Sequence, residues 1–382
     1  MNTARLRLWM VSPNYPPTSY TCGVGDYSAW VSSGLAGAGW DITAICSSRH
    51  TGNDFDGPVR VVKLAARFGW MAGFALLRRA MRGKPDIICI QHTPTLYGFG
   101  FRLMVCVIAR FSPVAVCYHT LHGSTFLSKL GALMLLRFCQ AAISTNEEVS
   151  AILSRYPRTC GKFEEIHIST NIMPRTPEPS LADARRTLAV PESAAMLCNF
   201  GLYYEGRGVE TLLQACSILK QRKTPFVLYL LGSIREGDAP YTSLIRNMIG
   251  DLSLQDDVKV TGLMDDERLS LHLLAADLYV VPYDDGATIR RGSLLAGIAH
   301  GCAIVTTQAG LKSALLDESH ALVRVPAKNA AALADAIHDL LRNPGKREDL
   351  RTKARELRKR FSRDDIVRRL HEAFLRITGA GS

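Results

Sequence analysis

The sequence predicts an α/β protein of two domains, each with a parallel β-sheet covered by helices. Short β-rich apolar runs alternate with helical patterns through nearly all 382 residues, which is typical of βα units around parallel sheets. A chain of this length holds about two domains of ordinary size, and an apolar fraction of 47% supplies a core for both. A proline-rich stretch near the middle separates two series of such units.

The first domain is expected over residues 1–175. Apolar residues between its first two strands recur at the spacing of one helical face, from Tyr27 to Ala38. The expected strands are Leu6–Ser12, Trp40–Cys46, Val59–Leu64, Asp86–Gln91, Pro113–Tyr118, Ala141–Ser144 and Glu164–Ile168.

A linker is expected over residues 176–193, because prolines gather there and large apolar residues are few. The second domain then follows over residues 194–361. Its expected strands are Met196–Phe200, Phe226–Leu231, Val258–Thr261, Asp277–Pro282 and Cys302–Thr306. The charged helical segment at the end is interrupted near Phe361-Ser362, and we expect the helix 362–378 to join the first domain.

Composition limits the setting of the chain. The ten cysteines are scattered without a C-x-x-C pair, and several lie inside apolar runs. Charged residues interrupt every apolar stretch before the roughly 18 residues that a membrane span needs. The first apolar run is too short for a signal peptide. We therefore expect a cytoplasmic protein.

Two glycines lie in the turn Gly23-Val24-Gly25-Asp26-Tyr27, after the first strand. Glycines let backbone N–H groups approach an anion, and the start of a helix adds a favourable dipole. The turn also matches part of a dinucleotide-binding motif, but it lies about ten residues beyond the strand and no acidic residue closes the next strand. A glycine-rich turn without a ligand is the structural alternative.

His119 and His122 follow an expected buried strand, at the edge of a parallel sheet where ligands bind. A histidine there can orient a hydroxyl group or exchange a proton near neutral pH. The pair lacks a third ligand for zinc. A histidine that bonds only its own loop is the structural alternative.

Two loops of the second domain combine glycine with arginine. The loop from Gly201 to Gly208 contains Arg207 near a helix start, where a guanidinium can bind phosphate in bidentate fashion. The loop from Asp284 to Ser293 contains Arg290 and Arg291, and we expect it to bind a diphosphate rather than a metal, because its aspartates lack further ligands. Solvated surface arginines are the structural alternative.

The glycine turn, His119 and the two glycine–arginine loops occur in an order that resembles the family 4 retaining glycosyltransferases. The resemblance extends over nearly the whole chain. The resemblance also rests on Val260-Thr261-Gly262, on Ala276-Asp277-Leu278 with Val281-Pro282, and on the segment from Ala299 to Thr307. It implies the GT-B fold, in which two Rossmann-like domains with parallel sheets face a central cleft. It further implies a nucleotide-sugar donor bound mainly by the C-terminal domain, an acceptor bound mainly by the N-terminal domain, and neither cofactor nor metal.

The resemblance also assigns roles to residues. His119 corresponds to a histidine that contacts the donor sugar, and Arg207 to a lysine that stabilises the leaving diphosphate. The resemblance and the two loops together give this donor-binding set: Gly23, Gly25, Gly201, Arg207, Gly262, Gly286, Thr288, Arg290, Arg291 and Ser293. Asp26 is expected either to act as a base on the acceptor side or to cap its helix.

The sequence departs from the family pattern in two places. Leu202 stands where the family has a phosphate-binding arginine. Thr288 and Ala296 stand where it has two glutamates, which contact the donor sugar and the ribose. We expect Arg290 and Arg291 to compensate in part by binding the diphosphate.

The expected activity is retaining transfer of a sugar from a nucleotide-diphosphate sugar to a hydroxyl group of a saccharide or lipid-linked acceptor, in cell-envelope or polysaccharide biosynthesis. In the mechanism that the family implies, the leaving diphosphate oxygen helps to deprotonate the acceptor. One alternative is a catalytically silent GT-B protein that binds a sugar nucleotide or a partner. Another is an NAD-dependent oxidoreductase, which rests on the glycine turn alone.

The net charge of +11 is concentrated in one stretch. Residues 59–140 contain eleven basic side chains and a single acid, Asp86, and within 67–84 the cations alternate with aromatic and aliphatic residues. Such a segment can lie on an anionic membrane surface, here the inner face of the plasma membrane. A helix that packs its apolar side on the sheet is the structural alternative, and no motif indicates nucleic acid.

Overall fold

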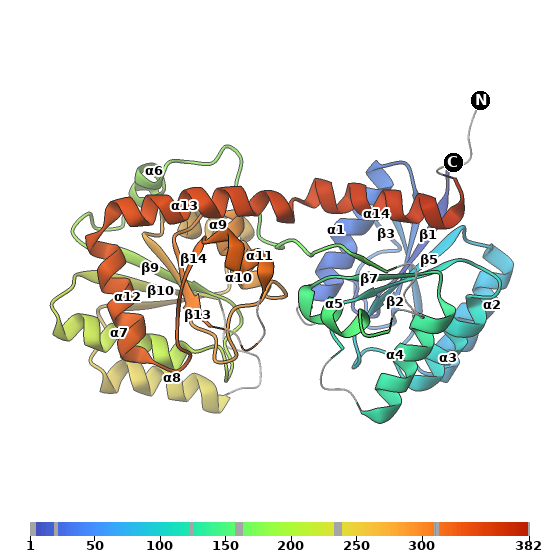
Figure 1. Ribbon diagram of the computed structural model, residues 1–382, viewed down its shortest axis with the longest axis horizontal. Helices are drawn as coiled ribbons and strands as arrows, with labels where there is room; N and C mark the ends of the chain where they lie inside the picture. Colours follow the sequence, from blue (N-terminus) through green and yellow to red (C-terminus); the bar gives the residue numbers. More distant parts are fainter. Residues whose placement is uncertain are drawn as a thin grey trace. The chain divides into compact units, whose positions relative to one another are not determined.

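The computed structural model describes residues 5–18, 22–121, 125–156, 163–232, 239–308, 310 and 313–380. The chain divides into two compact units, which Figure 1 shows in the colours of the sequence. The first domain contains residues 1–169 and 362–382, and the second domain contains residues 170–361.

The first domain is built on an eight-stranded sheet in the order β3-β4-β2-β1-β5-β6-β7-β8. The strands are β1 (Arg7–Val11), β2 (Asp41–Ser47), β3 (Phe55–Asp56), β4 (Val59–Ala65), β5 (Ile87–His92), β6 (Val114–Tyr118), β7 (Ala141–Ser144) and β8 (Phe163–Glu165). Neighbours pair in parallel, except that β3 is antiparallel to β4. Every residue of β5 and β6 is buried, as expected for central strands covered on both faces.

Helices cover both faces of this sheet (Figure 1). They are α1 (Gly23–Gly37), α2 (Trp70–Gly83), α3 (Phe99–Ile108), α4 (Phe126–Phe138), α5 (Glu147–Leu153) and α14 (Arg363–Thr378). On one face α2 packs against α3, and α3 packs against α4. The first two approach closely because Gly73 has no side chain: a Cβ there would lie 2.8 Å from the Cβ of Met104.

The end of the chain returns to the first domain. α14 packs against α1, and its residues Ile366, Leu370 and Phe374 are buried. The indole N–H of Trp40 donates to His371 Nδ1 over 2.9 Å, and its ring meets that of Phe374 edge-on. This bond satisfies the one polar atom of a buried Trp side chain and fixes the helix on the sheet.

The second domain is built on six parallel strands in the order β11-β10-β9-β12-β13-β14. They are β9 (Ala195–Phe200), β10 (Phe226–Leu231), β11 (Val258–Gly262), β12 (Leu278–Val281), β13 (Ile304–Thr307) and β14 (Leu322–Val325). This is the order of a doubly wound nucleotide-binding sheet. The prediction of two α/β domains with parallel sheets is confirmed.

Helices flank the second sheet as well. They are α6 (Leu181–Thr187), α7 (Val209–Gln221), α8 (Ala239–Asp251), α9 (Asp266–Ala275), α10 (Gly292–Ala299), α11 (Ala314–Ser319), α12 (Ala330–Arg342) and α13 (Pro344–Arg358), which a 3-10 turn (Lys359–Phe361) follows. Among the described residues, none of the helices combines the length and the apolar character that crossing a membrane requires.

The stretch 176–193 differs from the linker expected there, because it contains α6. Ser180 starts this helix by accepting a hydrogen bond from the N–H of Asp183. Helix α6 packs against α9, and Arg185 forms an ion pair with Asp277 just before β12. Because of the prolines on either side, the sequence predicted a linker where the structure has a short helix of the second domain.

Candidate functional site

The second sheet has a switch point between β9 and β12, from which the strand order runs outward in both directions. Ligands of such sheets bind beyond the carboxyl ends of the strands at this point. The loops after β9 and β12 lie side by side here, since the N–H of Asp284 donates to the carbonyl of Gly206 over 3.2 Å. They bring together most of the expected donor-binding residues: Gly201, Arg207, Gly286, Thr288, Arg290, Arg291 and Ser293.

Glycines permit this close approach. Gly208 precedes α7 with φ of 73°, and a Cβ there would lie 1.8 Å from the carbonyl oxygen of Pro282. A Cβ on Gly201 would lie 2.1 Å from Nη2 of Arg207. Neither position accepts a side chain without displacement of its neighbour. Gly262 ends β11 and forms a bridge with Gly232, where a Cβ would lie 2.2 Å from the carbonyl oxygen of Gly201.

Arg207 lies at the centre of the two loops. Its Nη2 donates to Ser293 Oγ over 3.2 Å, and its Cζ lies 5.6 Å from the ring centroid of Tyr204 and 5.2 Å from that of Tyr283. Within the described part of the chain, no carboxylate pairs with it. A guanidinium without a counter-charge, beside the start of a helix, is suited to bind an anion.

Arg290 and Arg291 share a single carboxylate, that of Asp285. Nη2 of Arg290 lies 3.5 Å from Oδ2, and Arg291 forms a closer ion pair with Oδ1. Arg291 also lies over Tyr283, 4.2 Å from the ring centroid, and its side chain is 12% exposed. Asp285 thus lies against both guanidinium groups of the loop, while the neighbouring Asp284 lies 3.4 Å from Lys328 Nζ.

Two polar atoms of this loop have unused hydrogen-bonding capacity. Thr288 Oγ1 and Arg291 Nε are buried, and neither has a partner among the described residues. Buried polar atoms normally have a hydrogen-bond partner, so these two atoms stand out among the described residues of the loop. Ala296, by contrast, lies buried inside α10 and offers only a methyl group.

His119 of the first domain follows β6 and is half-buried. Its Nε2 lies 2.8 Å from Gln91 Oε1, and its ring meets the ring of Tyr27 edge-on at 5.0 Å. Burial lowers the pKa of His119 to about 3, so the imidazole is neutral near pH 7. The histidine is therefore suited to orient a hydroxyl group rather than to exchange a proton. His122 lies outside the described residues.

The glycine turn of the first domain forms the start of α1. Cys22 is the N-cap and Asp26 lies in the first turn, so the expectation that Asp26 caps the helix is wrong. Gly25 is required by packing, because a Cβ there would lie 1.9 Å from the carbonyl oxygen of Asn14. A Cβ on Gly23 would meet no atom within 4 Å, so this position remains open to a ligand.

A pocket of about 410 Å³ opens beyond the carboxyl ends of β1, β2 and β4. Asn14 and Leu96, which follow β1 and β5, line it together, so it lies at the switch point of the first sheet. Arg49 and Arg67 also line it, and neither forms an ion pair with any residue that the structure describes. This is the candidate acceptor pocket.

A second buried histidine makes the first domain sensitive to acid. Neither ring nitrogen of His92 has a hydrogen-bond partner among the residues described, and burial lowers its pKa to about 3. In an unfolded chain a histidine takes up a proton at a pKa of about 6.5. Unfolding therefore binds protons between about pH 6.5 and pH 3, and stability is lost as the pH falls through that window.

We expect His92→Phe to flatten this dependence, because phenylalanine does not titrate and fills a site between aromatic rings. Each unit of pKa shift corresponds to about 1.4 kcal/mol. Thermal unfolding at pH 7.5 and pH 5 measures the effect. The difference in melting temperature, variant minus wild type, should be more positive at pH 5 than at pH 7.5. An equal difference at both values would contradict it.

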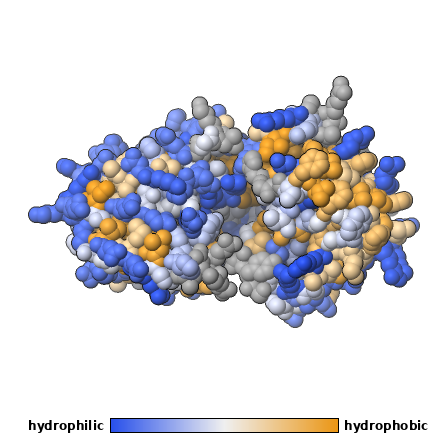
Figure 2. Space-filling model, turned by 90° about the horizontal axis from the view of Figure 1, so that it is seen from below, coloured by the Kyte–Doolittle hydropathy of each residue, from blue (hydrophilic) through white to orange (hydrophobic). Residues whose placement is uncertain are grey.

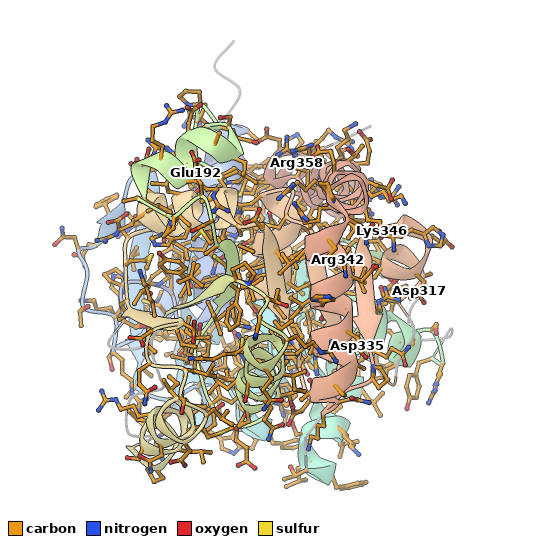
Figure 3. The ribbon with its side chains drawn as sticks, turned by 90° about the vertical axis from the view of Figure 1, so that its left-hand side faces the viewer. Glu192, Asp317, Asp335, Arg342, Lys346 and Arg358 are labelled. Carbon is orange, nitrogen blue, oxygen red and sulfur yellow. The ribbon has the colours of Figure 1, made fainter. Side chains whose placement is uncertain are left out.

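A larger groove, of about 960 Å³, lies at the amino-terminal edge of the second sheet. Figure 3 shows this side of the second domain, with Glu192 and Arg342 of the groove labelled. Arg185 is paired with Asp277, and Arg347 donates to two carbonyl groups in the last turn of α12. Arginines that bind the carbonyls of helix C-termini serve the fold, so this groove is not the candidate donor site.

Comparison with known proteins supports the fold of both domains. Residues 195–343 match the family model of the group 1 glycosyl transferases. The whole chain is similar in structure to the sucrose-phosphate synthase of Thermosynechococcus elongatus, with 18% identity, a TM-score of 0.79, and coverage of 98% of this chain and 100% of that chain. The fold is GT-B. The fold predicted from the sequence is thereby confirmed.

Other GT-B structures are equally extensive matches. A glycosyltransferase of Rickettsia africae is 14% identical, with a TM-score of 0.75 and coverage of 98% of both chains. Anabaena Alr3699/HepE, in complex with UDP and glucose, is 14% identical, with a TM-score of 0.72 and coverage of 96% of this chain and 99% of that chain. No curated protein matches the sequence.

The group 1 match covers both loops of the GT-B second domain that carry Arg207 and Arg291. Three residues of the candidate sites were not predicted from the sequence: Tyr283 in the second domain, and Gln91 and Arg49 in the first. Tyr283, which lies between the two arginines, follows an apolar run directly, and Gln91 is a polar residue near the end of another. Tyr283 and Gln91 could have been predicted, because each is a polar or aromatic residue at the end of an apolar run. Arg49 gave no signal, because only the folded chain brings it to the pocket.

Proposed function

We propose that the protein is a retaining glycosyltransferase that moves a sugar from a nucleotide-diphosphate sugar to a hydroxyl group of a saccharide or lipid-linked acceptor. The observation that carries the proposal is Arg207, a guanidinium with no carboxylate partner among the described residues, at the switch point of the domain that the group 1 model matches. The complexes of Anabaena HepE with UDP and with UDP-glucose support a nucleotide-sugar donor.

The chemistry follows from the charge that develops on the donor. Cleavage of the bond between the sugar and the diphosphate leaves negative charge on the diphosphate, and a preorganised cation lowers that barrier. Arg207 supplies this cation, Arg290 and Arg291 add a second one, and Thr288 Oγ1 offers a hydrogen bond. The leaving diphosphate oxygen helps to deprotonate the acceptor, so no divalent metal is needed.

The first domain takes the acceptor side. Its pocket offers Arg49 and Arg67, while Gly23 and Asp26 lie at the start of α1 and His119 at the end of β6. Asp26 is the candidate base, and His119 the candidate contact for a sugar hydroxyl. We place the protein in cell-envelope or polysaccharide biosynthesis, on the cytoplasmic side.

A screen of nucleotide release tests the activity. UDP-, GDP- and ADP-sugars are offered in separate reactions, with and without a metal chelator, and free nucleotide is measured. One donor should be consumed, and the chelator should change nothing. A protein that binds nucleotide without consuming sugar would be the silent alternative, which the absence of carboxylates at Thr288 and Ala296 favours.

Arg290→Ala and Arg291→Ala test the second loop. Loss of one charged hydrogen bond costs about 1.5–3 kcal/mol, so we expect donor turnover to fall by about 10–150-fold, with the larger effect for Arg291 because it is less exposed. Normal turnover in both variants would remove the loop from the mechanism.

The membrane proposal rests on α2. This helix buries Ala72, Gly73, Leu76 and Ala80, and exposes Trp70, Met71 and Phe74 by 50%, 85% and 57%. The helix therefore packs one apolar side into the core, as the structural alternative expects, and in addition exposes large apolar residues. Further exposed apolar residues lie on α4 and after α3: Phe126, Leu127, Leu130, Phe138 and Phe111. Figure 2 shows hydrophobic residues gathered over the first domain.

Basic residues accompany this apolar surface. Arg78, Arg79 and Arg82 are exposed on α2, and among residues 59–140 only Asp86 is acidic. Cations beside exposed aromatic side chains fit a surface of anionic lipids. We propose that α2, α3 and α4 bring the first domain to the membrane where a lipid-linked acceptor resides.

We expect the protein to sediment with vesicles that contain anionic lipid, and less so at high salt. Met71→Ser with Phe74→Ser should weaken sedimentation by about tenfold, since each removes apolar area from the contact. Leu263→Ser is the matched control: it removes a side chain that is 81% exposed from the second domain. Equal loss in the control, or no binding by the wild type, would contradict the membrane proposal.

A further inference from the structure

Gln91 is a buried amide near the end of β5, 1% exposed. Its Nε2 lies 3.0 Å from Met10 Sδ on β1 and 3.3 Å from Cys89 Sγ. Its Oε1 lies 2.8 Å from Nε2 of His119. The amide thus connects the central strand of the first sheet with the candidate substrate-binding histidine.

The orientation of the amide follows from the chemistry of its neighbours. A thioether sulfur carries no proton and can only accept, so the NH₂ group of Gln91 faces Met10. The amide oxygen then faces His119 and accepts the proton on its Nε2. The reversed orientation would set the oxygen against the sulfur of Met10 and lose that bond.

A neutral imidazole has one proton, so Nδ1 of His119 is a bare acceptor. It has no hydrogen-bond partner among the described residues. The backbone on both sides is fixed, since the N–H donates to the carbonyl of His92 over 3.0 Å and the carbonyl accepts from Asn146 Nδ2 over 3.0 Å. The ring cannot exchange its two nitrogens without losing the bond to Gln91.

We propose that Gln91 is a positioning residue that holds His119 as the Nε2–H tautomer and presents Nδ1 as the acceptor for a substrate hydroxyl group. The assignment rests on the proposed glycosyl transfer, whose sugar substrates supply such hydroxyl groups. The hydroxyl donates its hydrogen to Nδ1 without transfer of a proton. His119 thereby selects the orientation of a sugar and takes no part as acid or base.

The groups that face His119 leave this tautomer undisturbed. Tyr27 lies against it from α1, His92 is its neighbour at the end of β5, and Asn146 follows β7. Burial raises the pKa of Tyr27 and lowers that of His92, so both are neutral near pH 7. Among the described residues, burial is what moves the pKa of His119, and no carboxylate stabilises its imidazolium form.

Nitrogen NMR of the full chain, labelled in histidine and free of donor, tests the proposal. Wild-type His119 should remain the Nε2–H tautomer from pH 5 to pH 8. Gln91→Glu keeps an acceptor but adds a negative charge, which should bring protonation of His119 into that range. Gln91→Met removes the acceptor, and both tautomers should appear.

Gln140→Met is the matched control. It removes another amide of the same domain, whose Oε1 accepts from the N–H of Val114 and whose Nε2 donates to the carbonyl of Ala109. This control should leave the His119 signals as in the wild type. A change equal to that of Gln91→Met would mean that any lost amide in this domain disturbs His119, and would overturn the assignment.

Kinetics with the accepted donor give the second readout. Gln91→Met should lower kcat/KM by about tenfold at all pH values, the effect of one hydrogen bond, and Gln91→Glu should lose activity further as the pH falls from 8 to 6. A wild-type His119 that is protonated on Nδ1, or that titrates near pH 6.5, would overturn the proposal. The NMR result needs no donor, so it stands or fails separately from glycosyl transfer.

Discussion

Arg207→Ala should lower kcat for the nucleotide-sugar donor by about 10²–10³-fold, the usual effect of removing one preorganised group that stabilises transition-state charge. No carboxylate in the described part of the chain pairs with Arg207, so we expect its charge to act on the leaving diphosphate. Arg207→Lys should recover part of the rate, because a cation remains but the bidentate geometry is lost.

Single-turnover measurement of nucleotide release gives the rate. Arg222→Ala is the matched control: it removes an arginine of the same domain that is 38% exposed and pairs with Asp335 on α12, at the far edge of the sheet. The control should keep wild-type activity and thermal stability. If Arg207→Ala retained more than a third of the wild-type rate, the leaving group would have to be stabilised by other residues.

Gly208→Ala should destabilise the second domain by about 3–5 kcal/mol. The residue has φ of 73°, where a Cβ costs about 1–2 kcal/mol. That Cβ would also lie 1.8 Å from the carbonyl oxygen of Pro282, so the loops after β9 and β12 would have to separate. Arg207 and Ser293 would lose their contact as a result, and donor affinity should fall as well.

Gly206→Ala separates these two costs. Gly206 also has a positive φ, 92°, but a Cβ there would meet no atom within 4 Å. Gly206→Ala should therefore lower the free energy of unfolding by the conformational cost alone, about 1–2 kcal/mol. Thermal unfolding of both variants, with and without nucleotide, gives the comparison. Equal losses would show that the approach to Pro282 is not what requires glycine at position 208.

The fold could be predicted because its elements depend on local patterns. The run Ile87–Ile90 is apolar throughout, and the helical spacing after Tyr27 is regular. The prolines around α6 misled the prediction, since a short helix with one capping serine leaves little pattern.

The candidate site could be predicted only in part. Arg207 was found because a loop between a strand and a helix is a recognisable setting. That Asp285 would pair with Arg290 and Arg291 could not be read from adjacency alone, because the fold of the loop decides which side chains meet. Gln91 escaped because its contact with Met10 depends on the pairing of β1 with β5, strands far apart in the chain.

Helix α2 shows a different limit. Its pattern predicted an amphipathic helix with a basic side, but not which apolar residues would pack. The contact with α3 requires the small surface of Gly73 against Met104. Trp70 lies over a second glycine of α3, Gly100, where a Cβ would lie 2.2 Å from Trp70 Cδ2, and its side chain is half exposed. Helical periodicity does not express these close contacts.

The return of α14 to the first domain determines the order of events during synthesis. Residues 1–169 leave the ribosome first, yet Ile366, Leu370 and Phe374 complete their core. Domains generally fold as units in the order in which they are made. Here the second domain, residues 170–361, is complete before the first has its final helix. Until α14 is synthesised, Trp40 lacks its contacts with His371 and Phe374. We expect a chaperone that binds apolar surface to bind the first domain during this time.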